Sequence, residues 1–138
     1  MDLDETDVKL IDFLTKDSSI SYTELAKQLD ISDVAIKKRI DKLLSNKVIE
    51  RFSLEVNYKE MGRPVHAFML LKCIPSESDR LKQNISVNSE ILRIMPTIGE
   101  YDYMIEVVTK DVESLRKIAE EQVGSIRGVI QVRTVLVV

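Results

Sequence analysis

Residues 21–44 contain two short helix patterns separated by a three-residue turn, and this spacing constrains the fold more than any other feature of the chain. Ser21 and Glu24 have the spacing of a capping box, which predicts that a helix begins there. Asp30-Ile31-Ser32 supplies the turn, and Ser32 can cap the next helix. Two capped helices joined so tightly are typical of a helix-turn-helix, whose second helix enters the major groove of DNA.

The second predicted helix carries one apolar stripe, formed by Ile36, Ile40, Leu43 and Leu44. The stripe leaves the other side of the helix free to face DNA. The residues that we predict to bind DNA lie on that side, on its flanks or at the helix start: Ser32, Asp33, Val34, Ala35, Lys37, Lys38, Arg39 and Lys42.

These residues suit different parts of a duplex. Small apolar side chains such as Val34 and Ala35 can touch thymine methyl groups, and Lys38 and Lys42 can reach guanine edges or phosphates. Lys37 and Arg39 lie on the flanks and should meet phosphates. Asp33 could accept from a cytosine amino group, or it could only favour the positive end of the helix. The alternative is an ordinary solvated helix face.

The charge of the chain is unevenly distributed. The net charge of −3 argues mildly against binding to nucleic acid. Residues 27–51, however, hold seven bases and four acids, a balance of +3, whereas residues 1–26 hold two bases and seven acids, a balance of −5. A local basic face on an acidic protein suits sequence-selective binding.

Two further patterns flank the helix-turn-helix. Asp4 can cap a first helix with Asp7 near its positive end, and apolar residues recur at helical spacing as far as Leu14. After Asn46-Lys47 the pattern changes, and Phe52–Val56 alternates apolar and polar residues as a strand or short hairpin does. A winged helix-turn-helix has its wing at this position.

The remainder of the chain predicts a second domain of a different type. We place a winged helix-turn-helix domain at residues 1–57, a linker at 58–64 and a ferredoxin-like domain at 65–138, so the fold class is α+β. The second domain is expected to follow the order β-α-β-β-α-β. Its predicted elements are strand Val65–Cys73, a helix from Pro75 to about Asn88, strands Ile91–Ile98 and Tyr101–Thr109, a helix capped by Asp111, and strand Val129–Val138.

The turn at Gly99–Tyr103 is a candidate ligand site, because two tyrosines and two carboxylates surround a glycine. Asp102 could pair with an ammonium group while backbone N–H groups hold a carboxylate. Chemistry alone favours the other interpretation, a polar hairpin turn in which the tyrosines pack.

The sequence lacks the residues that several classes of function need. Cys73 and His66 are the only residues of their types, so no disulfide or multi-cysteine metal site is expected, and no catalytic set accompanies them. There is no Gly-rich phosphate loop, and we predict no cofactor and no metal. No apolar run reaches the roughly 20 residues that span a bilayer. The acidic N-terminus lacks a signal peptide, so a cytoplasmic location is expected.

The chain resembles the Lrp/AsnC family of prokaryotic transcription regulators, also called feast/famine regulatory proteins, over nearly its whole length. The motifs that carry the resemblance are Leu3-Asp4-x-x-Asp7-x-x-x-Ile11-x-x-Leu14, Glu24-Leu25-Ala26, Ile31-Ser32, Arg39-Ile40-x-Lys42-Leu43, Val48-Ile49 with Phe52, Gly99-x-Tyr101-Asp102-Tyr103, and Gly128-Val129 with Thr134. Ala35 departs from the pattern, because the family often has threonine there.

The resemblance implies a regulator that binds a pseudo-palindromic operator in double-stranded DNA. It implies dimers that form through the C-terminal sheets and often assemble to octamers. It also implies an amino acid effector bound between dimers, near the turn and the final strand. The effector residues implied are Gly99, Glu100, Tyr101, Asp102 and Thr134. The carboxylate of Glu100 makes lysine or arginine worth testing as the effector.

Two other functions stay open from the residues alone. One is a ferredoxin-like small-molecule-binding or enzymatic protein that does not bind DNA. The other is an architectural DNA-binding protein with weak sequence preference, which would show steep salt dependence and is disfavoured by the acidic overall charge.

Overall fold

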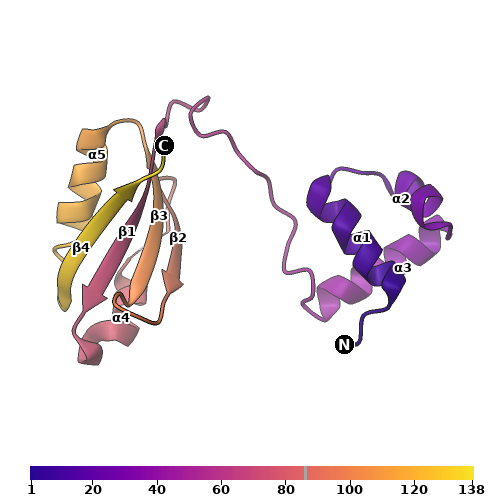
Figure 1. The fold of residues 1–138 in the computed structure, drawn as a ribbon, viewed down its shortest axis with the longest axis horizontal. Coiled ribbons are helices and arrows are strands. Elements are labelled where there is room, and N and C mark those ends of the chain that lie inside the picture. The colour runs from indigo at the N-terminus through magenta and orange to yellow at the C-terminus, as the bar shows by residue number, and fades with distance from the viewer. Residues whose placement is uncertain (86) are drawn as a thin grey trace. The chain divides into compact units, whose positions relative to one another are not determined.

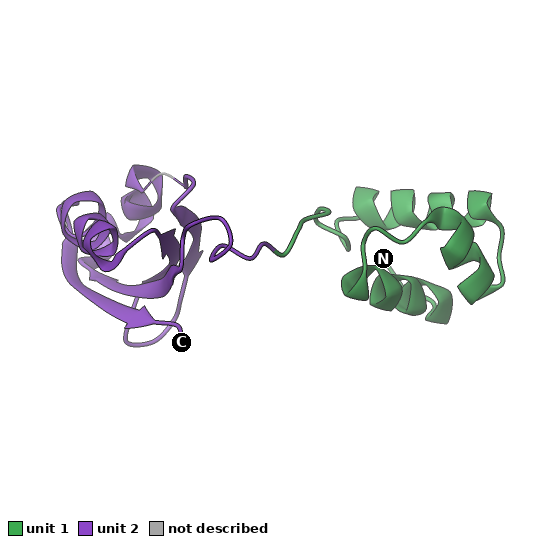
Figure 2. Ribbon diagram, turned by 90° about the horizontal axis from the view of Figure 1, so that it is seen from above, with its two compact units in different colours: residues 1–55 green, residues 56–138 purple. Residues whose placement is uncertain are grey.

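Two separate hydrophobic cores organise the chain. The computed structural model describes residues 1–85 and 87–138, which divide into two units, Met1–Glu55 and Val56–Val138 (Figure 2). Each unit has its own cluster of buried apolar side chains. Each is described separately below.

The first unit consists of three helices, α1 (Glu5–Lys16), α2 (Tyr22–Leu29) and α3 (Asp33–Ser45) (Figure 1). The helices pack together because each has a stripe of apolar residues at helical spacing. The buried core of the unit is Leu10, Leu14, Leu25, Ala26, Ile36, Ile40 and Leu43. The predicted apolar stripe of the third helix therefore faces the core.

All three helices begin at the predicted caps. The side chains of Asp4, Ser21 and Ser32 each accept a hydrogen bond from the backbone N–H three residues further on, at 2.8, 3.0 and 3.1 Å. At α1 the capping box is complete, because the Asp7 carboxylate accepts from the Asp4 backbone N–H at 3.2 Å. Such caps satisfy backbone donors that have no partner within the helix.

The turn between α2 and α3 is as tight as predicted. Asp30 adopts the left-handed conformation, with φ of 53° and ψ of 47°, and closes α2. The backbone N–H of Ile31 donates to the carbonyl of Ala26 at 3.1 Å. Aspartate tolerates this conformation better than most residues because its short polar side chain can bond locally. Ser32 then starts α3, which completes the helix-turn-helix.

The predicted strand or hairpin over Phe52–Val56 is wrong for the single chain. These residues are extended and exposed, but within residues 1–85 and 87–138 they belong to no strand. A strand needs a neighbour for its backbone N–H and C=O groups. The chain does not return along this segment, because residues 58–62 form turns instead. The alternating pattern is present, but the partner strand is not.

The second unit is built on a four-stranded antiparallel sheet (Figure 1). The strands are β1 (Val65–Cys73), β2 (Ile91–Pro96), β3 (Tyr103–Thr109) and β4 (Val129–Leu136), in the spatial order β2-β3-β1-β4. A 3₁₀ turn, η1 (Pro75–Glu77), and helix α4 (Ser78–Asn84) follow β1, and α5 (Val112–Lys117) with the π-helix η2 (Ile118–Val123) follows β3. This confirms the α+β class and the predicted β-α-β-β-α-β order.

Several predicted elements of the second unit are shorter in the structure: β2 ends at Pro96, β3 begins at Tyr103 and β4 ends at Leu136. The helix expected to reach Asn88 ends at Asn84, and Ser86, which that prediction included, lies outside the described residues. The Asn88 side chain instead accepts from the backbone N–H groups of Glu90 and Ile91, at 2.7 and 2.8 Å, and so starts β2. Local bonds of this kind compete with helix formation.

The two faces of the sheet differ. One face is buried under α4 and α5, where Ala67, Met69 and Leu71 of β1 join the core with Leu81 and Leu115. The opposite face carries the alternate residues of the same strands. Among the described residues, no helix packs on that opposite face.

The open face combines apolar and charged side chains. Phe68, Leu70 and Met104 are half-buried on it. Beside them the Glu106 carboxylate lies 2.9 Å from His66 Nε2 and 3.4 Å from Arg93 Nη2. An apolar sheet face with a charged row is suited to covering by another protein surface.

Candidate DNA-binding helix and effector turn

The outer face of α3 presents side chains that are free to contact a ligand. Val34 is 67% exposed, and Lys37, Lys38 and Lys42 are also exposed. None of these lysines forms an ion pair with a residue in the described part of the chain. The structure therefore brings four of the eight predicted DNA-binding residues together on one open face.

The residues at the start of α3 have structural partners. Ser32 caps the helix, and the Asp33 carboxylate accepts a hydrogen bond from the Thr23 hydroxyl at 3.0 Å. This bond links the start of α2 to the start of α3. It gives Asp33 a role that requires no cytosine contact. Ala35 is half-buried beside them.

Arg39 differs from the three lysines because it faces α1. Its Nη1 lies 2.9 and 2.8 Å from the two carboxylate oxygens of Asp4 and 2.8 Å from Oδ1 of Asp7. The Arg39 guanidinium, with help from the Asp7 backbone N–H, holds the pKa of Asp4 below its usual value. The two carboxylates in turn raise the pKa of Arg39.

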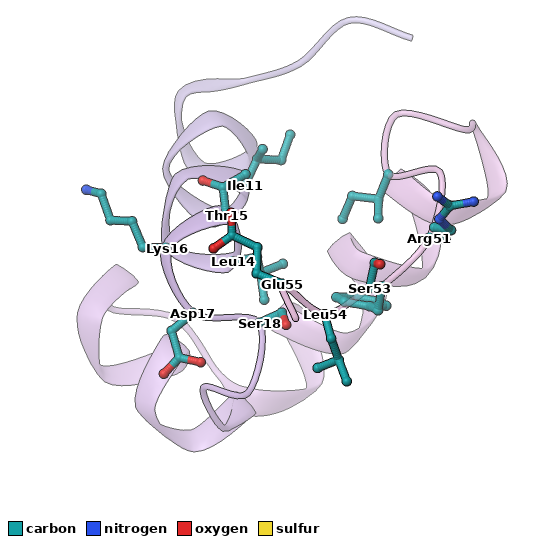
Figure 3. Close-up of a pocket in the computed structure, with 12 residues that line it drawn as sticks. Ile11, Leu14, Thr15, Lys16, Asp17, Ser18, Arg51, Ser53, Leu54 and Glu55 are labelled. Atoms are coloured by element: carbon teal, nitrogen blue, oxygen red, sulfur yellow. The ribbon is translucent and has the colours of Figure 1, made fainter. Parts of the chain in front are cut away.

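A groove of about 450 Å³ lies between α1 and the extended segment after α3 (Figure 3). Ile11 and Leu14 of α1 contribute apolar surface, and Lys16 of α1 and Arg51 of the segment lie on opposite sides of it. Leu54 is 84% exposed beside the groove. The segment therefore offers to solvent apolar side chains and backbone groups that bond to no other backbone group in the described part of the chain.

The predicted effector turn is held in place by hydrogen bonds at its base. Gly99 has a φ of +138°, and Gly99 and Glu100 are exposed at the tip. The Thr97 hydroxyl donates to the Tyr101 carbonyl at 2.7 Å, and the Thr97 backbone N–H donates to the Asp102 carbonyl at 2.9 Å. The turn thus has a fixed base and an open tip.

The Asp102 side chain points into this base. One carboxylate oxygen accepts from the Cys73 backbone N–H at 2.8 Å and lies 3.5 Å from the Cys73 thiol. Burial raises the pKa of that thiol, and Asp102 raises it further. Asp102 therefore serves the fold, and an ammonium group would have to share its carboxylate.

Thr134, which was predicted to bind the effector with the turn, lies on the other face of the sheet from the strand residue that contacts the turn. It pairs with Met69 in the sheet, whereas Arg133 pairs with Leu70 and so projects from the opposite face. Arg133 Nη1 lies 3.3 Å from the Tyr101 hydroxyl, and Tyr101 with nearby Glu100 raises the pKa of Arg133. Among the described residues of the last strand, Arg133 contacts the turn.

Two contacts were not predicted from the sequence, that of Arg133 with the turn and that of Asp7 with Arg39. Arg133 is a cation in an apolar strand, which is a recognisable pattern. Asp7 is a carboxylate three residues before Leu10 and seven before Leu14, both of which are buried. An acid at such a position faces the core and needs a partner. That spacing could have indicated that Asp7 has a partner within the chain, but not that the partner is Arg39.

Residues 1–85 and 87–138 contain neither a metal-binding cluster nor a membrane-spanning helix. No group of three or more histidine, cysteine, aspartate or glutamate side chains is arranged to hold a metal ion. No helix is both long enough and apolar enough to cross a bilayer.

The arrangement is that of a helix-turn-helix transcription regulator with a separate ligand-binding domain. Residues 3–44 match the model of the AsnC-type helix-turn-helix domain, and residues 66–138 match that of the Lrp/AsnC ligand binding domain. The chain belongs to the Lrp/AsnC family. This confirms the resemblance and the prediction of a DNA-binding regulator.

One sequence relative and two solved structures align with nearly the whole length of the chain. The chain is 31% identical to the HTH-type transcriptional regulator FL11 of Pyrococcus furiosus, covering 98% of this chain and 89% of that protein. AsnC of E. coli aligns over 100% and 93% of the two chains, with 21% identity and a TM-score of 0.87. A transcriptional regulator of Neisseria meningitidis, solved as a complex with L-Met, aligns over 99% and 90%, with 17% identity and a TM-score of 0.90.

Proposed function

We propose that this regulator binds double-stranded DNA through the outer face of α3. The observation that carries the proposal is the set of exposed, unpaired lysines on that face. Lys37, Lys38 and Lys42 can contact phosphates or guanine edges, and Val34 and Ala35 can meet thymine methyl groups. Ser32 and Asp33 act at the start of the helix, where backbone N–H groups can meet a phosphate.

Fluorescence anisotropy on a labelled duplex tests this assignment. The duplex is the fragment upstream of the protein's own gene, with scrambled DNA as competitor. Lys38→Gln should weaken binding by about tenfold, as expected for one lost charged contact. Lys110→Gln is the matched control, because Lys110 is an exposed lysine in the other unit. Equal affinity in the two variants would remove Lys38 from the interface.

We further propose that the effector is an amino acid bound at the Gly99–Asp102 turn. Glu100 is exposed at the tip and Arg133 lies beside Tyr101, so a carboxylate and a guanidinium are available to an amino acid's charged groups. The related regulator solved with L-Met supports the class of ligand. Glu100 favours a basic side chain, lysine or arginine.

A panel of amino acids, added to the DNA-binding measurement, tests the effector proposal. Lysine or arginine should change DNA affinity more than neutral amino acids do. Glu100→Gln should remove that preference and leave DNA binding without effector unchanged. If the variant keeps the wild-type preference, Glu100 does not select the effector.

We propose that the protein forms a homodimer and that the dimers assemble further to an octamer. Two open surfaces support dimerisation: the uncovered sheet face with Phe68, Leu70 and Met104, and the extended segment Phe52–Val56 with its unpaired backbone. An unpaired extended segment is a template for a second strand. A symmetric dimer would present two α3 helices to the two halves of a pseudo-palindromic site.

Analytical ultracentrifugation tests the dimer. Leu70→Glu places a charge on the open sheet face and should shift the protein toward monomer. Ile130→Glu is a control on β4, because Ile130 is 62% exposed outside that half-buried patch. An unchanged mass for Leu70→Glu would exclude this face as the dimer contact.

A further inference from the structure

Arg39 lies among the lysines of α3, but its positive charge is already paired with the carboxylates of Asp4 and Asp7 in the same chain. Its Nη1 contacts both carboxylate oxygens of Asp4 and one of Asp7, all within 2.9 Å. Its side chain is 31% exposed, whereas that of Asp7 is only 7% exposed. The guanidinium therefore lies between α3 and the first turn of α1.

The two carboxylates also maintain the start of α1. Asp4 caps the helix, and Asp7 accepts the Asp4 backbone N–H in return. Arg39 precedes Ile40, which is buried in the core of the unit. The ion pair thus joins the first turn of α1 to the middle of the helix that carries the exposed lysines.

Withdrawing Arg39 toward a DNA phosphate would be unfavourable. It would leave the buried Asp7 carboxylate without its cation, and an uncompensated buried charge costs more than an exposed ion pair contributes. Lys37, Lys38 and Lys42 have no such partner among the described residues, so contacting DNA costs them no internal ion pair.

We propose that Arg39 is a positioning residue for DNA recognition. It acts through Asp4 and Asp7 to fix where α3 lies against α1, and DNA phosphates are contacted by the neighbouring lysines. The inference rests on the proposed role of α3. It replaces the direct phosphate contact that the sequence suggested for Arg39.

The dependence of affinity on salt separates the two roles. The probe is the tightest duplex that the wild-type full chain selects from a random library. Each lost phosphate contact reduces the slope of log K against log salt by about 0.9. Lys38→Gln should show that reduction. Arg39→Gln should weaken binding by about tenfold with the slope unchanged. A slope reduced by about 0.9 in Arg39→Gln would overturn the proposal.

Asp7→Asn gives opposite expectations for the two roles. Asparagine keeps an oxygen to accept the Asp4 N–H but no longer holds Arg39 by charge. If Arg39 positions α3, Asp7→Asn weakens DNA binding even though Asp7 is buried. The double variant Asp7→Asn with Arg39→Gln then binds DNA no more weakly than either single variant does. If Arg39 contacts phosphate, freeing it strengthens binding or leaves it unchanged, and the proposal fails.

Folding is checked by circular dichroism at the temperature of the binding measurement. If Arg39→Gln does not fold, Arg39→Lys replaces it, because lysine can still pair with Asp7. Arg39→Lys should retain the wild-type slope, and adding Asp7→Asn to it should weaken binding. If Asp7→Asn leaves the DNA affinity of Arg39→Lys unchanged or raises it, the proposal fails. Failure of the wild-type chain to enrich any duplex would remove the DNA-binding role itself, and this inference with it.

Discussion

The Asp102 carboxylate accepts a hydrogen bond from the backbone N–H of Cys73 at 2.8 Å, and this bond joins the predicted effector turn to the end of β1. The Asp102 backbone N–H also donates to the Leu71 carbonyl at 2.8 Å. Asp102, which the sequence suggested as a ligand-binding residue, is therefore bonded into the base of the turn. We therefore expect substitutions that remove these bonds to change the position of the turn.

Asp102→Ala should lower the stability of the second unit by about 1–3 kcal/mol, because it leaves the buried Cys73 N–H without an acceptor. Asp102→Asn keeps one oxygen and should cost less. Chemical denaturation measures both. Glu100→Ala is the matched control, since Glu100 is exposed in the same turn, and its stability should stay within about 0.5 kcal/mol of wild type. Equal losses at the two positions would contradict the structural role of Asp102.

Gly128 and Gly99 should respond differently to substitution by alanine. Both have positive φ, +95° and +138°, but only at Gly128 would a Cβ meet another side chain, 2.5 Å from Glu77 Cβ. Gly99→Ala should cost about 1 kcal/mol from backbone strain, and Gly128→Ala about 3 kcal/mol because overlap adds to strain. Thermal unfolding measures the difference. If Gly99→Ala costs as much as Gly128→Ala, the overlap at Gly128 is relieved by movement of Glu77.

Features that depend on nearby residues were predictable from the sequence. Asp4, Ser21 and Ser32 are caps because their bonding partners are three residues away. The apolar stripe of α3 and the β-α-β-β-α-β order of elements along the chain were predictable from periodicity, which is also a local property. The ion pair of Arg39 with Asp7 and the bond of Asp102 to Cys73 join residues 32 and 29 positions apart. Such pairs depend on how elements pack, so a single sequence does not specify them.

The prediction of a strand at Phe52–Val56 was wrong for a related reason. Its alternating pattern is a local property, but a strand forms only when another segment supplies hydrogen-bond partners. The candidate effector residues likewise include some that lie where local sequence predicts and some whose position depends on strand pairing. Gly99 and Glu100 are at the open tip as expected, whereas Thr134 pairs with Met69 and Arg133 contacts the turn. Which of two adjacent strand residues faces the turn is set by the sheet register.

Ser32→Ala should weaken both folding and DNA binding. Ser32 caps α3, so its loss should cost the first unit about 1 kcal/mol. Fraying of the first turn would also disorder Asp33 and Val34, which lie where α3 is proposed to enter the groove. Hydrogen exchange of the α3 amides and anisotropy on DNA measure the two effects. Ser89→Ala, at an exposed serine outside any helix in the second unit, is the control and should change neither. Unaltered exchange in Ser32→Ala would show that the cap is dispensable.

Acid should release the link between α1 and α3 through Asp4. The pKa of Asp4 in the folded protein lies below its ordinary value near 3.8, chiefly because Arg39 bonds to its charged form. A depressed folded pKa stabilises the protein fully above the unfolded value, and the contribution is lost as the pH falls through the folded pKa. Carboxyl-detected NMR titration should therefore give Asp4 a pKa below 3.8 in the wild type and nearer 3.8 in Arg39→Gln. Lys38→Gln should leave the Asp4 titration unchanged, because Lys38 does not contact Asp4 in the structure. An Asp4 pKa that does not move in Arg39→Gln would mean that the ion pair is not formed in solution.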